Sequence, residues 1–190
     1  MRLQLLSTPN PLAILPAEEV ANFLRVDNPS DMAEISRLIR AAFSKFEEYT
    51  GRQVATATYK MTLRSFPRCG RFIRIPKPPL VSITSVGYYA TAGSLTTLAE
   101  STGYQVSYDE VFAYLESAPS SYWPATASGL ANGVEVTFSC GYGTARENVD
   151  EDLIHSLKVL CGHWHENRET GDLPEFIQNL WGSWLTEVHD

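Results

Sequence analysis

The residues best suited to chemistry lie near the end of the sequence, where Cys161, His163 and His165 occur in one short segment. Thiolate and imidazole groups are the usual protein ligands of zinc. On a helix, Cys161 and His165 would share one face, whereas His163 would point elsewhere. No second closely spaced pair of Cys or His completes a set of four ligands, so Glu166 or Asp152 would have to contribute. We therefore expect these residues to pack a helix, and we predict no metal site and no cofactor.

Nucleophilic catalysis is a second possibility, because Ser139 and Cys140 precede Gly141 and His155 could act as a base. The GxSxG signature is absent, and no local motif pairs either nucleophile with a base. The Walker and GxGxxG phosphate-binding patterns are absent as well, and turns at strand ends explain the glycines in 140–143. We predict no catalytic residues, no cofactor-binding residues and no enzymatic activity.

The overall charge is acidic, with a formal net charge of -7, unlike proteins that bind nucleic acid by neutralising its phosphates. DNA could still pass such a protein transiently, as the cargo of a channel. The basic residues gather around one predicted hairpin, and they are Arg64, Arg68, Arg71, Arg74 and Lys77. Two interpretations stay open. The group is a solvated strand face, or Arg71 and Arg74 contact an acidic neighbour or passing DNA.

The three cysteines, Cys69, Cys140 and Cys161, are an odd number without paired spacing, so no disulfide framework is expected. The first residues contain Pro9 and Pro11, which interrupt any signal-peptide core. No apolar run approaches the ~20 residues that span a bilayer. We expect a protein that is made in the cytoplasm and has no membrane partner.

Helical periodicity dominates both ends of the sequence. A short helix is expected over residues 16–26, and a longer one begins after Asp31, which forms a capping box with Glu34, and ends at Gly51. Near the carboxyl end, one helix is capped by Asn148 or Asp150 and runs to about residue 168. Its predicted buried face consists of Leu153, Leu157, Leu160, Cys161 and Trp164.

The last predicted helix begins at Pro174 and is unusually aromatic on one side. The residues on that side are Phe176, Ile177, Leu180, Trp181 and Trp184. Either they pack on the other helices, or they exceed what a small core can cover and bind a partner. We retain both alternatives, and these five residues with Arg71 and Arg74 are the candidate partner-binding residues.

The middle of the chain alternates with the period of β-strands, most clearly over residues 53–64. Further strands are expected over residues 72–75, 81–89, 104–108, 111–115 and 134–138, separated by Pro, Gly, Ser and Asn. The predicted fold is therefore α+β: a small helical core of two N-terminal and two C-terminal helices, interrupted by an antiparallel β-rich insertion. We place the helical parts at 1–52 and 144–190, and the insertion at 53–143.

Several motifs in this order resemble the head-tail connector proteins of tailed phages and prophages, in the longer branch of the family with a β-rich insertion. They are FSKFEEYTGR at 43–52, FIRIPKPPLVSITSV at 72–86, residues 104–106, Trp123-Pro124, VEVTFSCGYG at 134–143 and HWHENRE at 163–169. His165 departs from the pattern, since an aromatic residue such as Tyr is expected there. The resemblance implies packed helices with a β insertion, and no catalytic residues.

The resemblance also implies a structural role in the virion. Such adaptors assemble as a ring of about a dozen copies under the portal protein, bind the next connector, stopper or tail protein, and leave a channel for DNA. Subunits of this kind are often monomeric before docking. We accordingly expect the virion's head-tail interface as the final location, after synthesis in the host cytoplasm.

Two alternatives remain. A stopper or tail-completion protein of the virion would share the binding logic and a similar sheet. A small metal-dependent hydrolase would instead require a convergent polar pocket, and bound zinc would favour it.

Overall fold

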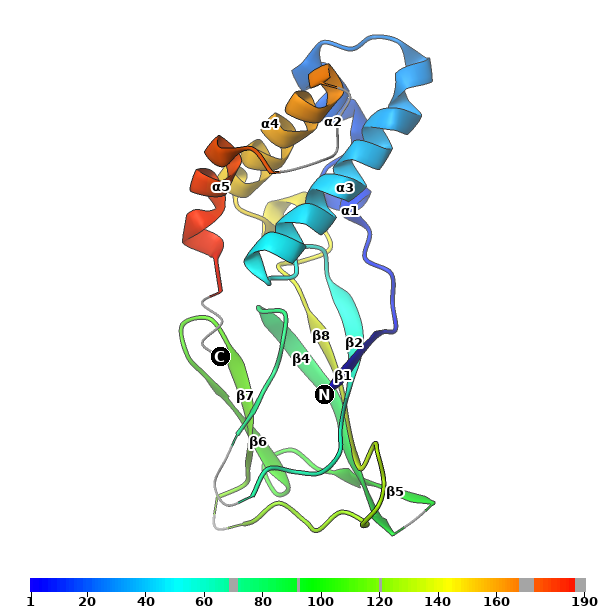
Figure 1. Ribbon diagram of the computed structural model, residues 1–190, viewed down its shortest axis with the longest axis vertical. Helices are drawn as coiled ribbons and strands as arrows, with labels where there is room; N and C mark the ends of the chain where they lie inside the picture. Colours follow the sequence, from blue (N-terminus) through cyan, green and yellow to red (C-terminus); the bar gives the residue numbers. More distant parts are fainter. Residues whose placement is uncertain (69–71, 92, 120, 168–172, 187–190) are drawn as a thin grey trace. The chain divides into compact units, whose positions relative to one another are not determined.

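The computed structural model describes residues 1–68, 72–91, 93–119, 121–167 and 173–186 (Figure 1). The chain divides into two compact units. The helical unit comprises residues 9–56 and 142–190, and the β unit comprises residues 1–8 and 57–141. The α+β fold predicted from the sequence, with helices on both sides of an antiparallel β-rich segment, is confirmed.

The helical unit contains five α-helices and three short 3-10 helices among its described residues. The α-helices are α1 (Pro11–Ile14), α2 (Ala17–Leu24), α3 (Met32–Thr50), α4 (Glu151–Asn167) and α5 (Glu175–Trp181). The 3-10 helices are η1 (Pro29–Asp31), η2 (Arg146–Asn148) and η3 (Gly182–Trp184). Helix α1 is the one α-helix that the sequence pattern did not predict.

Helix α3 ends where the sequence predicted, but it does not begin with the predicted capping box. Gly51 caps its carboxyl end with a positive φ of 74°, a conformation that glycine adopts without strain. The predicted capping box at the other end is wrong, because Asp31 has helical backbone angles and its side chain makes no capping hydrogen bond. Asn28 begins the segment instead, since its side chain accepts a hydrogen bond from the Ser30 amide and starts η1 one turn earlier.

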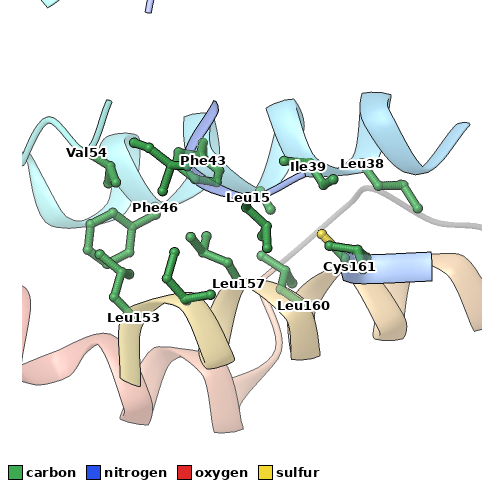
Figure 2. Close-up of a cluster of buried hydrophobic side chains, with 14 of the residues drawn as sticks. Leu15, Leu38, Ile39, Phe43, Phe46, Val54, Leu153, Leu157, Leu160 and Cys161 are labelled. Atoms are coloured by element: carbon green, nitrogen blue, oxygen red, sulfur yellow. The ribbon is translucent and has the colours of Figure 1, made fainter. Parts of the chain in front are cut away.

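The core of the helical unit lies between α3 and α4 (Figure 2). Their apolar side chains point toward one another, with Leu15 from the loop after α1 inserted between them. The predicted buried face of α4 is confirmed, since all five of its residues are buried. Outside this layer, the Lys158 ammonium pairs with the Glu19 carboxylate and links α4 to α2.

Among its described residues, the β unit contains two antiparallel sheets. The strands are β1 (Arg2–Leu5), β2 (Ala57–Leu63), β3 (Ile73–Arg74), β4 (Leu80–Thr91), β5 (Ser94–Leu98), β6 (Tyr104–Tyr108), β7 (Ala113–Ser117) and β8 (Val134–Cys140). The larger sheet has the order β1-β2-β8-β4-β5, and the smaller has the order β3-β7-β6. Strands β1 and β5 were not predicted from the sequence.

The two faces of the larger sheet differ in polarity. On one face, Met61, Val136 and Phe138 are buried in the core of the β unit. On the opposite face, Lys60 forms an ion pair with Glu135 across the strands at 2.7 Å. This alternation confirms the half-buried strand predicted over residues 53–64. Among the described residues, none of the helices combines the length and the apolar character that crossing a bilayer would require.

Candidate partner-binding surfaces

Helix α5 has one buried face and one exposed face. Ile177 and Trp181 are fully buried in the helical core, whereas Phe176 and Leu180 are 46% and 48% exposed. Pro174 is the N-cap of the helix, and its carbonyl accepts hydrogen bonds from the Ile177 and Gln178 amides. The five predicted partner-binding residues of this segment therefore do not share one environment.

Trp181 is held by specific contacts inside the helical unit. Its ring meets Phe46 edge to face, with 5.0 Å between centroids, and its indole N–H donates a hydrogen bond to the Ser156 hydroxyl at 2.7 Å. Trp184 packs partly buried against the same core, 6.2 Å from the Phe46 ring. Core packing, one of the two alternatives, accounts for Ile177 and Trp181. Partner binding by the exposed Phe176 and Leu180 stays a prediction.

Hydrogen bonds join the segment after α5, at Trp184 and Thr186, to the carboxyl end of α3. The Arg52 guanidinium donates a hydrogen bond to the Trp184 carbonyl at 2.7 Å. The Thr186 hydroxyl and amide both donate to the Thr50 carbonyl, at 2.6 and 3.0 Å. These bonds satisfy a carbonyl at the helix terminus that lacks an intrahelical partner. Sequence reasoning did not identify these residues, because the partners are far apart in the chain.

A shallow hollow of about 380 Å³ adjoins the exposed face of α5. Its lining includes Phe23 and Leu24 of α2, Gly162 and His163 of α4, and Phe176 of α5. Phe23 is 45% exposed, and the rings of His163 and Phe176 meet edge to face at 5.9 Å. An aromatic surface thus extends from α2 across α4 to α5 within the helical unit.

The sequence segment with metal-ligand chemistry is split between the core and the surface. Cys161 is fully buried with a free thiol, while His163 lies beside the Asn167 side chain. In the part of the chain that the structure describes, no three His, Cys, Asp or Glu side chains gather in a way that could hold a metal ion.

The residues considered for nucleophilic catalysis have other contacts. The Ser139 hydroxyl shares a hydrogen bond with the Thr58 hydroxyl across the sheet at 3.1 Å, and the His155 ring lies against the Phe23 ring.

Burial raises the pKa of the Cys161 thiol to about 12. The thiol should therefore stay protonated in the folded protein at pH 8, and it should react with iodoacetamide far more slowly than in the urea-unfolded chain. Because the folded pKa lies above the unfolded value, the neutral thiol stabilises the fold below pH 9, and this stability is lost as the pH rises toward 12. Mass spectrometry of the Cys161 peptide after timed alkylation measures the reaction, and equal rates in both states would contradict the assignment.

The predicted basic group is only partly described, since Arg71 lies outside the described residues. Arg74 on β3 is exposed, and its guanidinium lies over the Phe112 ring at 4.6 Å. Nearby, the Tyr114 hydroxyl donates a hydrogen bond to Asp109 at 2.6 Å, and this bond, the largest cause, lowers the pKa of the Asp109 carboxyl. Arg64 and Arg68 are exposed as well. Binding of a partner through Arg71 and Arg74 stays a prediction.

The fold is that of chains found in the neck of a phage-like particle. One solved structure, the neck of an empty gene transfer agent particle computed with C6 symmetry, has a chain 23% identical in sequence with a TM-score of 0.82. The neck of the native particle, computed with C12 symmetry, has a chain with 22% identity and a TM-score of 0.77.

A chain of the native gene transfer agent virion gives 24% identity and a TM-score of 0.76. Each comparison covers 98% of this chain and 96% of the other. None of the three is described as an enzyme. No family model and no curated protein matches the sequence. The likeness confirms the fold that the resemblance to head-tail connectors implied.

Proposed function

We propose that this chain is a structural, non-enzymatic head-tail connector of a tailed phage or prophage, an adaptor that assembles as a ring under the portal. The observation that carries the proposal is the likeness to neck chains over nearly the whole length of both partners. A fold alone does not define a function. The ordered sequence motifs over residues 43–169 support the same role.

A ring subunit needs surfaces for its neighbours and for the portal. Subunits related by rotation meet through two different patches, one on each side of the interface. The C6 and C12 symmetries of the similar neck structures support a closed ring. The ring binds the portal on one side and the next connector, stopper or tail protein on the other. DNA passes through its channel as transient cargo.

The exposed face of α5 is our candidate for the portal contact, as part of the segment from 172 to 190. Exposed aromatic and aliphatic side chains that adjoin a hollow are typical of interface hot spots. Phe176 meets this description, and Phe23 lines the same hollow from α2. Leu180 is exposed on the same helix as Phe176 and adds a second apolar side chain to this face. Arg74 on the β unit is the candidate for a contact with an acidic neighbour.

Replacing Phe176 and Leu180 together with Glu is expected to weaken binding to purified portal particles at least about tenfold, because both anchors are lost and two charges enter the interface. Co-sedimentation of the chain with the particles measures the affinity. Tyr108→Glu is the matched control, since Tyr108 is exposed to 67% on the β unit. Binding that stays unchanged in the double variant would refute the α5 contact, whereas failure of the unaltered chain to bind any portal would refute the function itself.

A further inference from the structure

The larger sheet of the β unit ends in two strands that each pair on one side. Strand β1 pairs with β2, and β5 pairs with β4. Among the described residues, no further strand continues the sheet beyond either one. An edge strand presents main-chain N–H and C=O groups that can pair with another chain. The sheet therefore offers two separate surfaces of the same chemical kind.

Both edges have few of the features that usually prevent pairing. Natural edge strands are blocked by charged side chains, proline or bulges. Strand β1 has the sequence RLQL with one charge, and β5 has the sequence SLTTL with no charge and no proline. The single register shift between β4 and β5 lies next to the hairpin turn, and Leu95–Leu98 pair regularly with Val86–Tyr89.

The core face of the sheet is apolar up to both edges. Residues that pair across neighbouring strands point to the same face of the sheet. One such row crosses all five strands and consists of Leu3, Met61, Val136, Val86 and Leu98. Leu3 on β1 and Leu98 on β5 are partly buried against the core. Leu5 lies on the same face of β1 as Leu3 and is 45% exposed. A neighbouring strand on the same face would cover these side chains.

Strand direction selects one way of joining two copies. Four successive antiparallel pairings give β1 and β5 the same direction. In a ring whose axis runs along the strands, rotation from one subunit to the next leaves the strand direction unchanged. Strand β5 of one subunit would therefore pair in parallel with β1 of the next subunit. A two-fold axis would instead pair β1 with another β1. Two different, complementary edges fit a ring rather than a dimer.

From these observations we propose that the edges β1 and β5 are the lateral interface of the ring, with β5 of each subunit pairing in parallel with β1 of the next copy. The inference rests on the proposed ring-forming function and adds the surface through which the ring closes. It makes the five-stranded sheet of each subunit one segment of a sheet that continues around the assembly.

Cysteine cross-linking tests this pairing. Gln4→Cys and Thr97→Cys are introduced together in a Cys69→Ser background, since Cys140 and Cys161 are buried. Gln4 and Thr97 are exposed, and the register places both on the polar face of the sheet. The chain is treated with a short bismaleimide, both bound to portal particles and alone at high concentration. The double variant should give a ladder of multimers, and each single variant should give monomers.

The controls separate this proposal from the function on which it rests. A second double variant, Gln4→Cys with Glu110→Cys, places the partner thiol on the exposed turn of the other sheet and should give no ladder. Portal binding without a ladder, or dimers from either single variant, would overturn the edge pairing while leaving the adaptor role intact. A ladder from the free chain without portal binding would overturn the adaptor role and leave the pairing standing.

A charge placed at each edge gives an independent test. Leu5→Lys with Thr97→Lys should lower the yield of multimers at least about tenfold, because lysine on an edge strand opposes edge-to-edge pairing. Ser121→Lys, at an exposed loop position of the same unit, is the control and should leave the yield unchanged. Circular dichroism verifies that all variants are folded, and multimers at the original yield in the folded double variant would also overturn the pairing.

Discussion

Replacing Trp181 with Ala should destabilise the helical unit by about 3–5 kcal/mol, the usual cost of removing a large buried aromatic side chain. The variant loses the edge-to-face contact with Phe46 and leaves the Ser156 hydroxyl without its indole donor. Because a chain with two units need not unfold in one step, hydrogen exchange of the amides in α3 and α4 is the appropriate measurement. Their exchange should become markedly faster.

The matched control for Trp181→Ala lies on the same short helix. Leu180→Ala removes an apolar side chain that is 48% exposed and should cost less than about 1 kcal/mol. Equal effects of the two substitutions would contradict the separation of α5 into a core face and an exposed face. A small effect of Leu180→Ala would show that the Leu180 side chain is not needed for the fold of the helical unit.

Replacing Phe138 with Ala should destabilise the β unit by a similar amount, about 3–5 kcal/mol. Phe138 is fully buried in β8, the strand that pairs with both β2 and β4, and its ring stacks on Tyr59 with 6.0 Å between centroids. Amide exchange should accelerate in β2, β4 and β8. Thr137→Ala, on the polar face of the same strand, is the control and should cost less than about 1 kcal/mol.

The same two variants test the proposed division of the chain into domains. If the helical parts form one domain and the β insertion another, Phe138→Ala should leave amide protection in α3 and α4 largely intact. Trp181→Ala should likewise spare β2 and β8. Loss of protection in both units from either substitution would contradict independent domains.

The helices and strands that were predicted best are those in which the spacing of apolar residues matches the face that is buried in the fold. Helices α3 and α4 repeat apolar residues at helical spacing, and one face of each packs in the shared core. Strand β2 alternates because one face of its sheet is buried. In these elements, local periodicity and tertiary burial agree, so the pattern alone is informative.

The elements that were missed depend on pairing with distant segments. Strand β1 has only four residues, so its alternation of polar and apolar residues is too short to predict a strand, and its pairing with β2 is not visible in the local sequence. Strand β5 is mostly exposed, so neither face leaves an apolar signal in the sequence. The bonds from Thr186 to Thr50 and from Arg52 to Trp184 likewise join positions far apart in the chain. Local sequence contains no information on such partners.

The candidate site was predicted in outline only. Helical spacing placed five apolar residues of the terminal segment on one side, but spacing cannot say which of them the core covers. Helix α5 turns Ile177 and Trp181 into the core and leaves Phe176 and Leu180 exposed. The proposed ring interface could not be predicted from the sequence, because it consists of β1 and β5, the two strands that the local pattern did not indicate.

The central claim is that this chain forms a ring on a portal. Electron microscopy of portal particles mixed with the purified chain measures it most directly. We expect a closed ring of about a dozen copies on the narrow end of the portal, around an open channel. Bare portal particles at saturating protein concentration, or a chain attached at another site without ring symmetry, would contradict the assignment.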